Sequence, residues 1–181
     1  MTQSLPPKTW LQRAWRVLRH LLADPRQVPR TLGPGVLERL TARVQASEAL
    51  HAGELRLCIE AGLPLSYLQR GASPRERAVM MFSKLRVWDT EANTGVLIYL
   101  LLADHAIEIV ADRGLNAHVS PAQWQAIIET LRPALAEGRY EDGLSLAIDQ
   151  LGALLQTHCP RPAGAAGQAD RNELADAPDL R

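Results

Sequence analysis

The sequence has few cysteines, no net charge and few aromatic residues, and each shortage excludes a class of protein. Cys58 and Cys159 are the two cysteines among 181 residues, and they show neither metal-ligand spacing nor the several pairs of a disulfide framework. Because 20 basic side chains balance 20 acidic ones, the chain as a whole has no electrostatic attraction to nucleic acid. We therefore expect a protein of a reducing compartment that does not bind nucleic acid.

Long apolar runs are also missing from the sequence. No segment approaches the length of a membrane span, and Arg13, Arg16 and Arg19 interrupt the one N-terminal stretch that could resemble a secretion signal. These absences predict a cytoplasmic protein. With 46% apolar but 4% aromatic residues, the 181 residues suffice for one domain with a mainly aliphatic core.

The N-terminal segment, residues 8–23, contains no Gly or Pro and has the pattern of an amphipathic helix. One arc carries Trp10, Leu11, Ala14, Trp15, Val17, Leu18, Leu21 and Leu22, and the other carries Gln12, Arg13, Arg16, Arg19 and His20. Two interpretations stay open. Trp10 and Trp15 could lie at a lipid headgroup boundary while Arg13, Arg16 and Arg19 meet an anionic membrane surface or a membrane protein, or the helix could pack on its own domain.

The chain is predicted to have four parts. They are a basic amphipathic helix at 1–24, an irregular linker at 25–35, an α/β domain at 36–160 and a disordered tail at 161–181. Within the domain the order is helix, strand, helix, strand, strand, helix, helix. A right-handed crossover makes the first two strands parallel, so the fold class is α/β. We expect a three-layer α/β/α sandwich with a small mixed β-sheet, preceded by the N-terminal amphipathic helix.

Two acidic loops are predicted to meet at one end of this sheet. The run from Gly95 to Leu102 is apolar throughout, as in a strand buried on both faces, and Asp104-His105 is the predicted hairpin loop. If Ala103 pairs with Ala106, Leu97 lies opposite Asp112. The loop before the first strand of the hairpin would then lie beside the loop after the second.

This sheet end is a candidate site for Ca²⁺ or Mg²⁺, because hard cations prefer several oxygen ligands on a flexible turn. The candidate metal ligands are Asp89, Glu91, Asn93, Asp112 and Glu54. Other interpretations stay open at each position. The acidic loop lacks the glycine and glutamate of an EF-hand, Asp112 could cap a short turn, and Glu54 could be an ordinary edge-strand charge. Motifs of the Walker, Gly-x-Ser-x-Gly and cysteine-phosphatase types are absent from the sequence.

Several segments in order resemble the TPM domain family, and in particular its small intracellular bacterial members. His51 to Arg56 resembles the family's Ser-Gly-Glu-Ile-Arg strand entry, and Asn93 to Tyr99 resembles its Asn-Gly-Val-Leu-Ile-Tyr signature. Ile109 to Leu115 is similar to the Gly-Asp-Lys-Gly-Ile segment that follows. The resemblance covers residues from about 36 to 160. The chain departs from the family pattern at Asn93-Thr94, where an Arg or Asp followed by Asn usually precedes the glycine. This segment therefore offers fewer charged ligands for a cation.

The resemblance implies an α/β/α sandwich and a link to divalent cation binding, weak acid phosphatase activity or membrane-protein assembly. We therefore expect a binding or assembly-support module, peripheral at the inner face of the membrane, with a divalent cation site. The alternative is a weak metal-dependent phosphomonoesterase, in which Asp112 is the catalytic carboxylate and Asn93 contacts the substrate.

Overall fold

A computed structural model of the chain describes residues 10–161 and 173–181. Within them the first helices are α1 (Trp10–Leu22), α2 (Val28–Leu32) and α3 (Val36–Glu48), with a 3-10 turn η1 (Pro25–Gln27) after α1. The later helices are α4 (Leu65–Gln69), α5 (Pro74–Lys84), α6 (Arg113–Asn116), α7 (Pro121–Ala136) and α8 (Tyr140–His158). The strands are β1 (Glu54–Glu60), β2 (Gly95–Leu101), β3 (Ala106–Ala111) and β4 (Asp179–Leu180), and η2 (Leu102–Asp104) joins β2 to β3.

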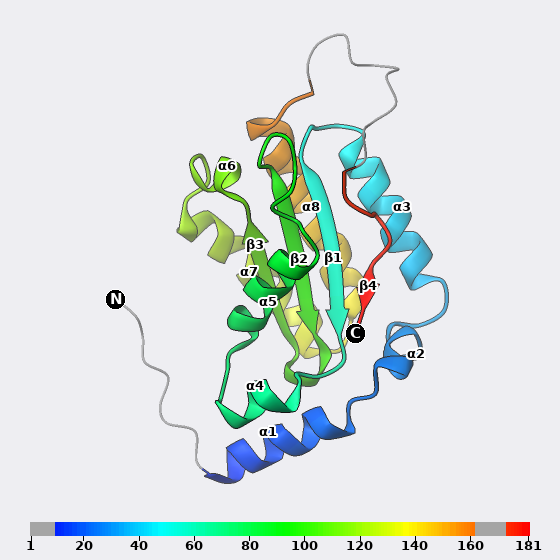
Figure 1. Cartoon of the computed structure of the whole chain (residues 1–181). Coiled ribbons are helices and arrows are strands. Elements are labelled where there is room, and N and C mark those ends of the chain that lie inside the picture. The colour runs from blue at the N-terminus through cyan, green and yellow to red at the C-terminus, as the bar shows by residue number, and fades with distance from the viewer. Residues whose placement is uncertain (1–9, 162–172) are drawn as a thin grey trace.

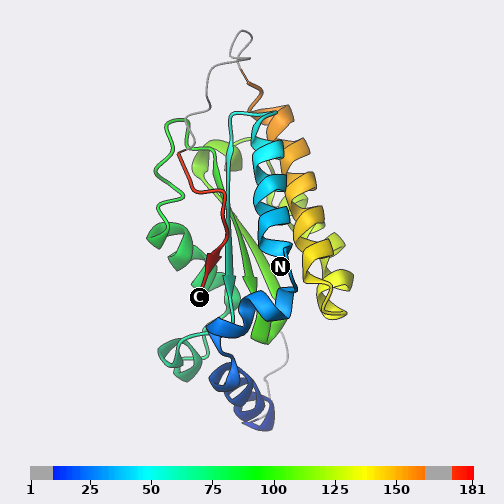
Figure 2. The ribbon, with the colours of Figure 1, turned by 90° about the vertical axis from the view of Figure 1, so that its right-hand side faces the viewer.

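These elements form a mixed sheet between two helical layers (Figures 1 and 2). The strand order is β3-β2-β1-β4, with β2 parallel to β1 and antiparallel to β3. α3, α7 and α8 cover one face, and α4 and α5 cover the other. The predicted α/β/α sandwich with a mixed sheet and an N-terminal helix is therefore confirmed.

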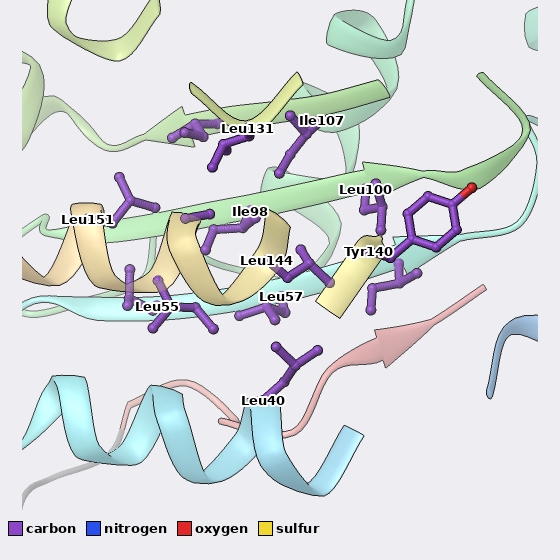
Figure 3. Packing of buried hydrophobic residues seen from close by; sticks show 14 of the residues in the cluster. Leu40, Leu55, Leu57, Ile98, Leu100, Ile107, Leu131, Tyr140, Leu144 and Leu151 are labelled. Carbon is purple, nitrogen blue, oxygen red and sulfur yellow. The ribbon is translucent and has the colours of Figure 1, made fainter. Parts of the chain in front are cut away.

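The core explains the continuous apolar run of β2, which is buried at every position. Alternate residues of a strand point to opposite faces, so Ile98 and Leu100 pack against α3, α7 and α8 while Leu97 and Tyr99 face α4 and α5. Figure 3 shows the first of these clusters, in which Leu144 and Leu151 of α8 lie over the sheet and Leu40 of α3 extends toward it. A central strand apolar on both faces thus requires a helical layer on each side.

The turn between β2 and β3 is longer than the sequence suggested. Leu101 pairs with Ala106, so Leu97 lies opposite Val110 rather than Asp112, and the predicted register is wrong by two residues. The reason is the 3-10 turn η2, which is closed by His105 in a left-handed conformation at φ 48°. A shift of two residues keeps every side chain on its predicted face, and Asp112 still lies beside the start of β2, where its N–H donates to the Gly95 carbonyl at 2.9 Å.

Two segments that the sequence assigned to irregular chain are ordered elements instead. The supposed linker contains η1 and α2, and Val28 and Leu32 are buried in the main core cluster. Pro25 and Pro29 lie in first turns, where the missing N–H would have no helical partner. In the predicted tail, residues 173–181 lie along β1, where β4 pairs in parallel. Residues 162–172 of that tail lie outside the described residues.

Candidate functional site

The predicted meeting of loops at one sheet end is present. Glu54 is the register partner of Gly95, whose carbonyl accepts the Asp112 N–H, so β1, β2 and β3 bring these three residues together. The Gly114 N–H donates to the Asn93 carbonyl at 3.1 Å. A Cβ at Gly114 would lie 2.6 Å from that oxygen, so a glycine is required for this approach. The two acidic loops therefore touch through their backbones.

The side chains of the candidate metal site have other partners. Asp112 Oδ1 accepts the Arg113 N–H at 2.6 Å and caps α6. Exposed Asp89 lies 3.6 Å from Arg86, and buried Glu54 accepts the Leu174 N–H at 3.4 Å. Within residues 10–161 and 173–181, no group of three or more His, Cys, Asp or Glu side chains is arranged to hold a metal ion.

One feature of this sheet end still points to a missing partner. Asp112 Oδ2 is buried and meets no hydrogen-bond donor among the described residues. Glu91 is exposed, and Asn93 is half-buried in a left-handed conformation at φ 55°. A buried carboxylate oxygen without a donor is costly, so it favours a ligand or water at this position.

A second carboxylate group near this end was not predicted. Glu48 at the end of α3 accepts the Leu55 N–H at 2.6 Å. Its burial, with the neighbouring charges of Glu54 and Asp176, raises its pKa to about 8. Glu48 is therefore protonated at neutral pH. No sequence signal connects it to Asp176, because the contact depends on how residues 173–181 fold back onto β1.

The N-terminal helix α1 docks on the domain through its polar arc. Arg16 Nη2 donates to Asp104 Oδ2 at 2.8 Å, and Arg19 donates to Asp104 Oδ1 at 3.3 Å. His20 Nδ1 accepts the Leu63 N–H at 2.9 Å, so Nε2 carries the ring proton and donates to Asp104 at 3.1 Å. Burial alone would raise the Asp104 pKa, but the hydrogen bonds from His20 and Arg16 outweigh it and hold that pKa far below its usual range.

The apolar arc of α1 faces away from the domain. Its exposed side chains range from 45% exposure at Leu18 to 75% at Trp10, and the set is Trp10, Leu11, Trp15, Leu18, Leu21 and Leu22. Figure 1 shows α1 lying across the base of the domain, crosswise to the strands. Val17 alone among the large apolar residues of α1 packs against the core. The sequence identified both arcs, but it did not indicate which of them would dock.

The five residues predicted to meet a membrane or partner differ in how exposed they are. Trp10, Arg13 and Trp15 are exposed, whereas Arg16 is largely enclosed by its contact with Asp104. Arg19 contacts Asp104 and keeps 40% of its side chain exposed. Asp104 itself was interpreted only as a hairpin residue, because nothing local indicates that a helix 84 to 88 residues earlier in the chain would dock there.

The sequence profile of the TPM domain matches residues 29–154. The chain belongs to the TPM domain family. The matched region begins within α2, which the sequence had assigned to a linker, and ends within α8. A search of curated proteins gave no match.

Two solved structures share the fold of this TPM domain. The BA42 protein of the psychrophilic bacterium Bizionia argentinensis is 23% identical, with a TM-score of 0.69 over 82% of this chain and 94% of that one. The N-terminal domain of a protein from P. gingivalis is 17% identical, with a TM-score of 0.57 over 77% of this chain and 94% of that one. At these identities the likeness shows the fold alone.

Proposed function

We propose that this TPM domain protein is a membrane-peripheral binding module that docks on anionic lipid through the outward face of α1. The observation that carries the proposal is the orientation of α1, because its polar arc is fixed to Asp104 while six large apolar side chains face away from the domain. A contiguous exposed apolar stripe of this kind marks an interaction surface. Within the described residues, no helix is both long and apolar enough to cross a membrane, so α1 would lie in the interface.

Charge around α1 favours a lipid surface as the occupant. Residues 10–32 contain Asp24 as their one acid, against the bases Arg13, Arg16, Arg19, Arg26 and Arg30. Arg13, Arg26 and Arg30 have exposed side chains. Each basic residue near an anionic surface contributes about 1 kcal/mol to binding, and exposed tryptophans suit the headgroup boundary. The crosswise position of α1 would let the domain stand on the membrane with the helix in its plane.

Vesicle flotation tests this proposal. We expect the protein to float with phosphatidylglycerol vesicles and not with phosphatidylcholine vesicles. Trp15→Glu should weaken binding about tenfold or more, because it replaces an exposed indole that would insert at the headgroup boundary with a charge that anionic lipid repels. Trp88→Glu is the matched control, since Trp88 is 48% exposed but lies after α5 rather than on α1. Flotation that survives Trp15→Glu would reject the role of α1.

A divalent cation at Asp112 is a second candidate function, favoured by the buried Oδ2 that has no donor. Mg²⁺ keeps several waters and often needs only one or two carboxylates, so a full cluster is not required. Asp112 could supply one ligand, and Glu91, Asp89, Asn93 and Glu54 are the further candidates. The phosphomonoesterase alternative rests on the same residue, because a bound cation there would neutralise the phosphate charge.

Calorimetric titration with Mg²⁺ and Ca²⁺ tests the cation site, and hydrolysis of p-nitrophenyl phosphate tests the enzyme. Asp112→Asn should abolish cation binding without unfolding the protein, because asparagine also caps helices. Asp142→Asn, at an exposed carboxylate of α8, is the control. Cation binding that persists in Asp112→Asn would exclude this site, and turnover that persists would exclude Asp112 as the catalytic group.

A further inference from the structure

The two edges of the sheet differ. Beside β1 lies β4, which closes that edge, whereas β3 forms the other edge with no described strand beside it. The Asp112 N–H bonds to Gly95, so in an antiparallel ladder residues 106, 108 and 110 of β3 bond to β2. The backbone groups of Ile107, Ile109 and Ala111 therefore point outward.

Most of the outward carbonyls of β3 are already used. The Ile109 carbonyl accepts a hydrogen bond from Arg75, and the Ala111 carbonyl accepts one from Asn116 at 2.8 Å. The N–H groups of Ile107, Ile109 and Ala111 are left without a strand to pair with. An unpaired strand edge can pair with another extended chain. On β3 this edge has more free backbone N–H groups than free carbonyls.

A groove runs along this edge between β3 and α7. Two hollows of about 350 and 400 Å³ adjoin each other there, one near His105 and Leu135 and the other near Ala111 and Trp124. They share Glu108, Gln125 and Ile128. Figure 1 shows α7 beside β3 on the outer side of the sheet. The groove thus extends over the length of the strand.

The groove wall also favours an occupant that supplies acceptors. The indole Nε1 of Trp124 is buried and meets no acceptor among the described residues. Arg75 and Arg132 bring two exposed guanidinium groups to the groove. Arg75 lies 3.7 Å from Glu108, and Arg132 lies 3.1 Å from Glu129. Half-buried Ile128 supplies apolar surface between them, over the buried Ile107 and Ile109. An extended peptide has the matching chemistry, because its carbonyls accept from strand N–H groups and its alternate side chains fill pockets.

We propose that the groove between β3 and α7 binds an extended peptide segment of a partner protein, with alternating apolar and acidic side chains, as an added antiparallel or parallel strand on β3. The other edge shows that this sheet accepts such a segment. Residues 173–181 lie along β1, where Arg56 binds the carbonyls of Ala175 and Ala177. On β3, Arg75 donates to the Ile109 carbonyl of the strand itself and keeps an exposed side chain, so it lies beside the edge where a carboxylate of the peptide would come. This proposal goes beyond membrane docking, and either can fail without the other.

The test uses the full chain in solution without vesicles. The probe is a fluorescein-labelled peptide of alternating valine and glutamate, and its control has proline at the central positions, which cannot pair as a strand. We expect the first peptide to bind and the second not to bind. In a ¹⁵N spectrum the bound peptide should shift the amides of Ile107, Ile109 and Ala111 and the indole N–H of Trp124.

A blocking variant locates the site. Gln125→Trp places a large side chain in the groove from an exposed helical position and should weaken the affinity about tenfold or more. Gln156→Trp, at an exposed position of α8 outside the groove, is the matched control and should bind as the wild type does. Equal binding of both peptides, shifts confined to other residues, or no binding at all would overturn the proposal. A dimer of the free protein with β3 amides protected would also overturn it, because a second copy would then occupy the edge.

Discussion

The buried acidic side chains of this domain differ in the charge of their neighbours. Glu60 at the end of β1 receives two hydrogen bonds from Arg77, at 2.8 and 2.5 Å, and one from the Tyr99 hydroxyl at 2.5 Å. Burial, with the Glu60 charge, raises the pKa of Tyr99 far above its usual range, so the hydroxyl stays a donor. For Glu48, burial and the neighbouring charges of Glu54 and Asp176 raise the pKa to about 8. The neighbours of a buried acid therefore matter as much as its burial.

Glu48→Gln should change how stability depends on pH. Because the Glu48 pKa is about 8 in the folded state and has an ordinary value of 4.5, the folded state holds one more proton between these values. Stability therefore falls as pH rises from about 5 to 8, and the contribution is lost above the folded pKa. Glutamine resembles the protonated acid, so the variant should be more stable at pH 9 by roughly 2 to 4 kcal/mol, at about 1.4 kcal/mol per unit of pKa.

Urea denaturation at several pH values measures this effect. Glu38→Gln, at an exposed position of the same helix, is the control and should leave the pH profile unchanged. A Glu48→Gln profile parallel to that of the wild type would show that Glu48 does not titrate in this range.

At the level of elements, α1 is bound by charge where most amphipathic helices are bound by apolar contacts. Asp104 contacts Arg16, Arg19 and His20, which lie on one arc of the helix. The His20 ring also accepts a hydrogen bond from the Leu63 N–H. A Cβ at Gly62 would lie 2.9 Å from the His20 carbonyl oxygen, so glycine allows the close approach of α1. The helix can thus be held firmly while its apolar arc remains outside.

Asp104→Asn should loosen α1 without unfolding the sheet. A hydrogen bond to a charged group contributes about 1.5 to 3 kcal/mol, so we expect a loss of roughly 2 kcal/mol in the attachment of α1. Hydrogen exchange of residues 10–22 should accelerate, with little change in β2. Asp89→Asn, at an exposed carboxylate, is the control.

Acid should have the same effect on the wild type. Because the Asp104 pKa is depressed in the folded state, its contribution is present above the unfolded value of about 3.9 and is lost as pH falls below it. Protection of α1 that is insensitive to both the substitution and acid would show that Val17 and other apolar contacts hold the helix.

At the scale of the whole molecule, one edge of the sheet is covered by another strand and the other edge is open. The β1 edge is closed by the segment 173–181, which is anchored by the buried Leu174, by the Leu174 N–H to Glu54 and by the Arg181 N–H to the Ile59 carbonyl at 3.0 Å. The β3 edge lies open beside the groove along α7. With α1 at the base of the domain, the molecule presents two separate surfaces, one apolar and one rich in backbone donors (Figure 1).

Removing residues 173–181 should destabilise the domain and expose the β1 edge. Burying a leucine contributes about 1.5 to 3 kcal/mol, so the loss of Leu174 and its neighbouring hydrogen bonds should lower the free energy of unfolding by roughly 3 kcal/mol. The free edge should also increase self-association, as measured by light scattering. Leu174→Ala should reproduce part of the stability loss while the strand pairing is kept. A truncated chain of unchanged stability would show that β4 adds nothing to the sheet.

Much of the fold was predictable because local patterns carried it. Ser73 with Glu76 and Ser120 with Gln123 form the capping boxes at α5 and α7, each from residues three positions apart. The candidate site was predictable only in part. Its loops do meet, because strand order alone brings chain ends together, but the partners of Asp89, Glu54 and Asp112 depend on Arg86, Leu174 and the start of α6.

The sequence by itself determined the apolar run of β2, the two arcs of α1 and the helix starts, because each follows from side chains a few residues apart. Tertiary structure alone decided that α1 docks by its arginines, that residues 25–35 and 173–181 belong to the fold, and that Glu48 is buried among acids. Those outcomes depend on contacts such as Arg16 with Asp104, 88 residues apart. Residues so far apart in the sequence form no periodic pattern that would predict their contact, so only the packing of the folded chain brings them together.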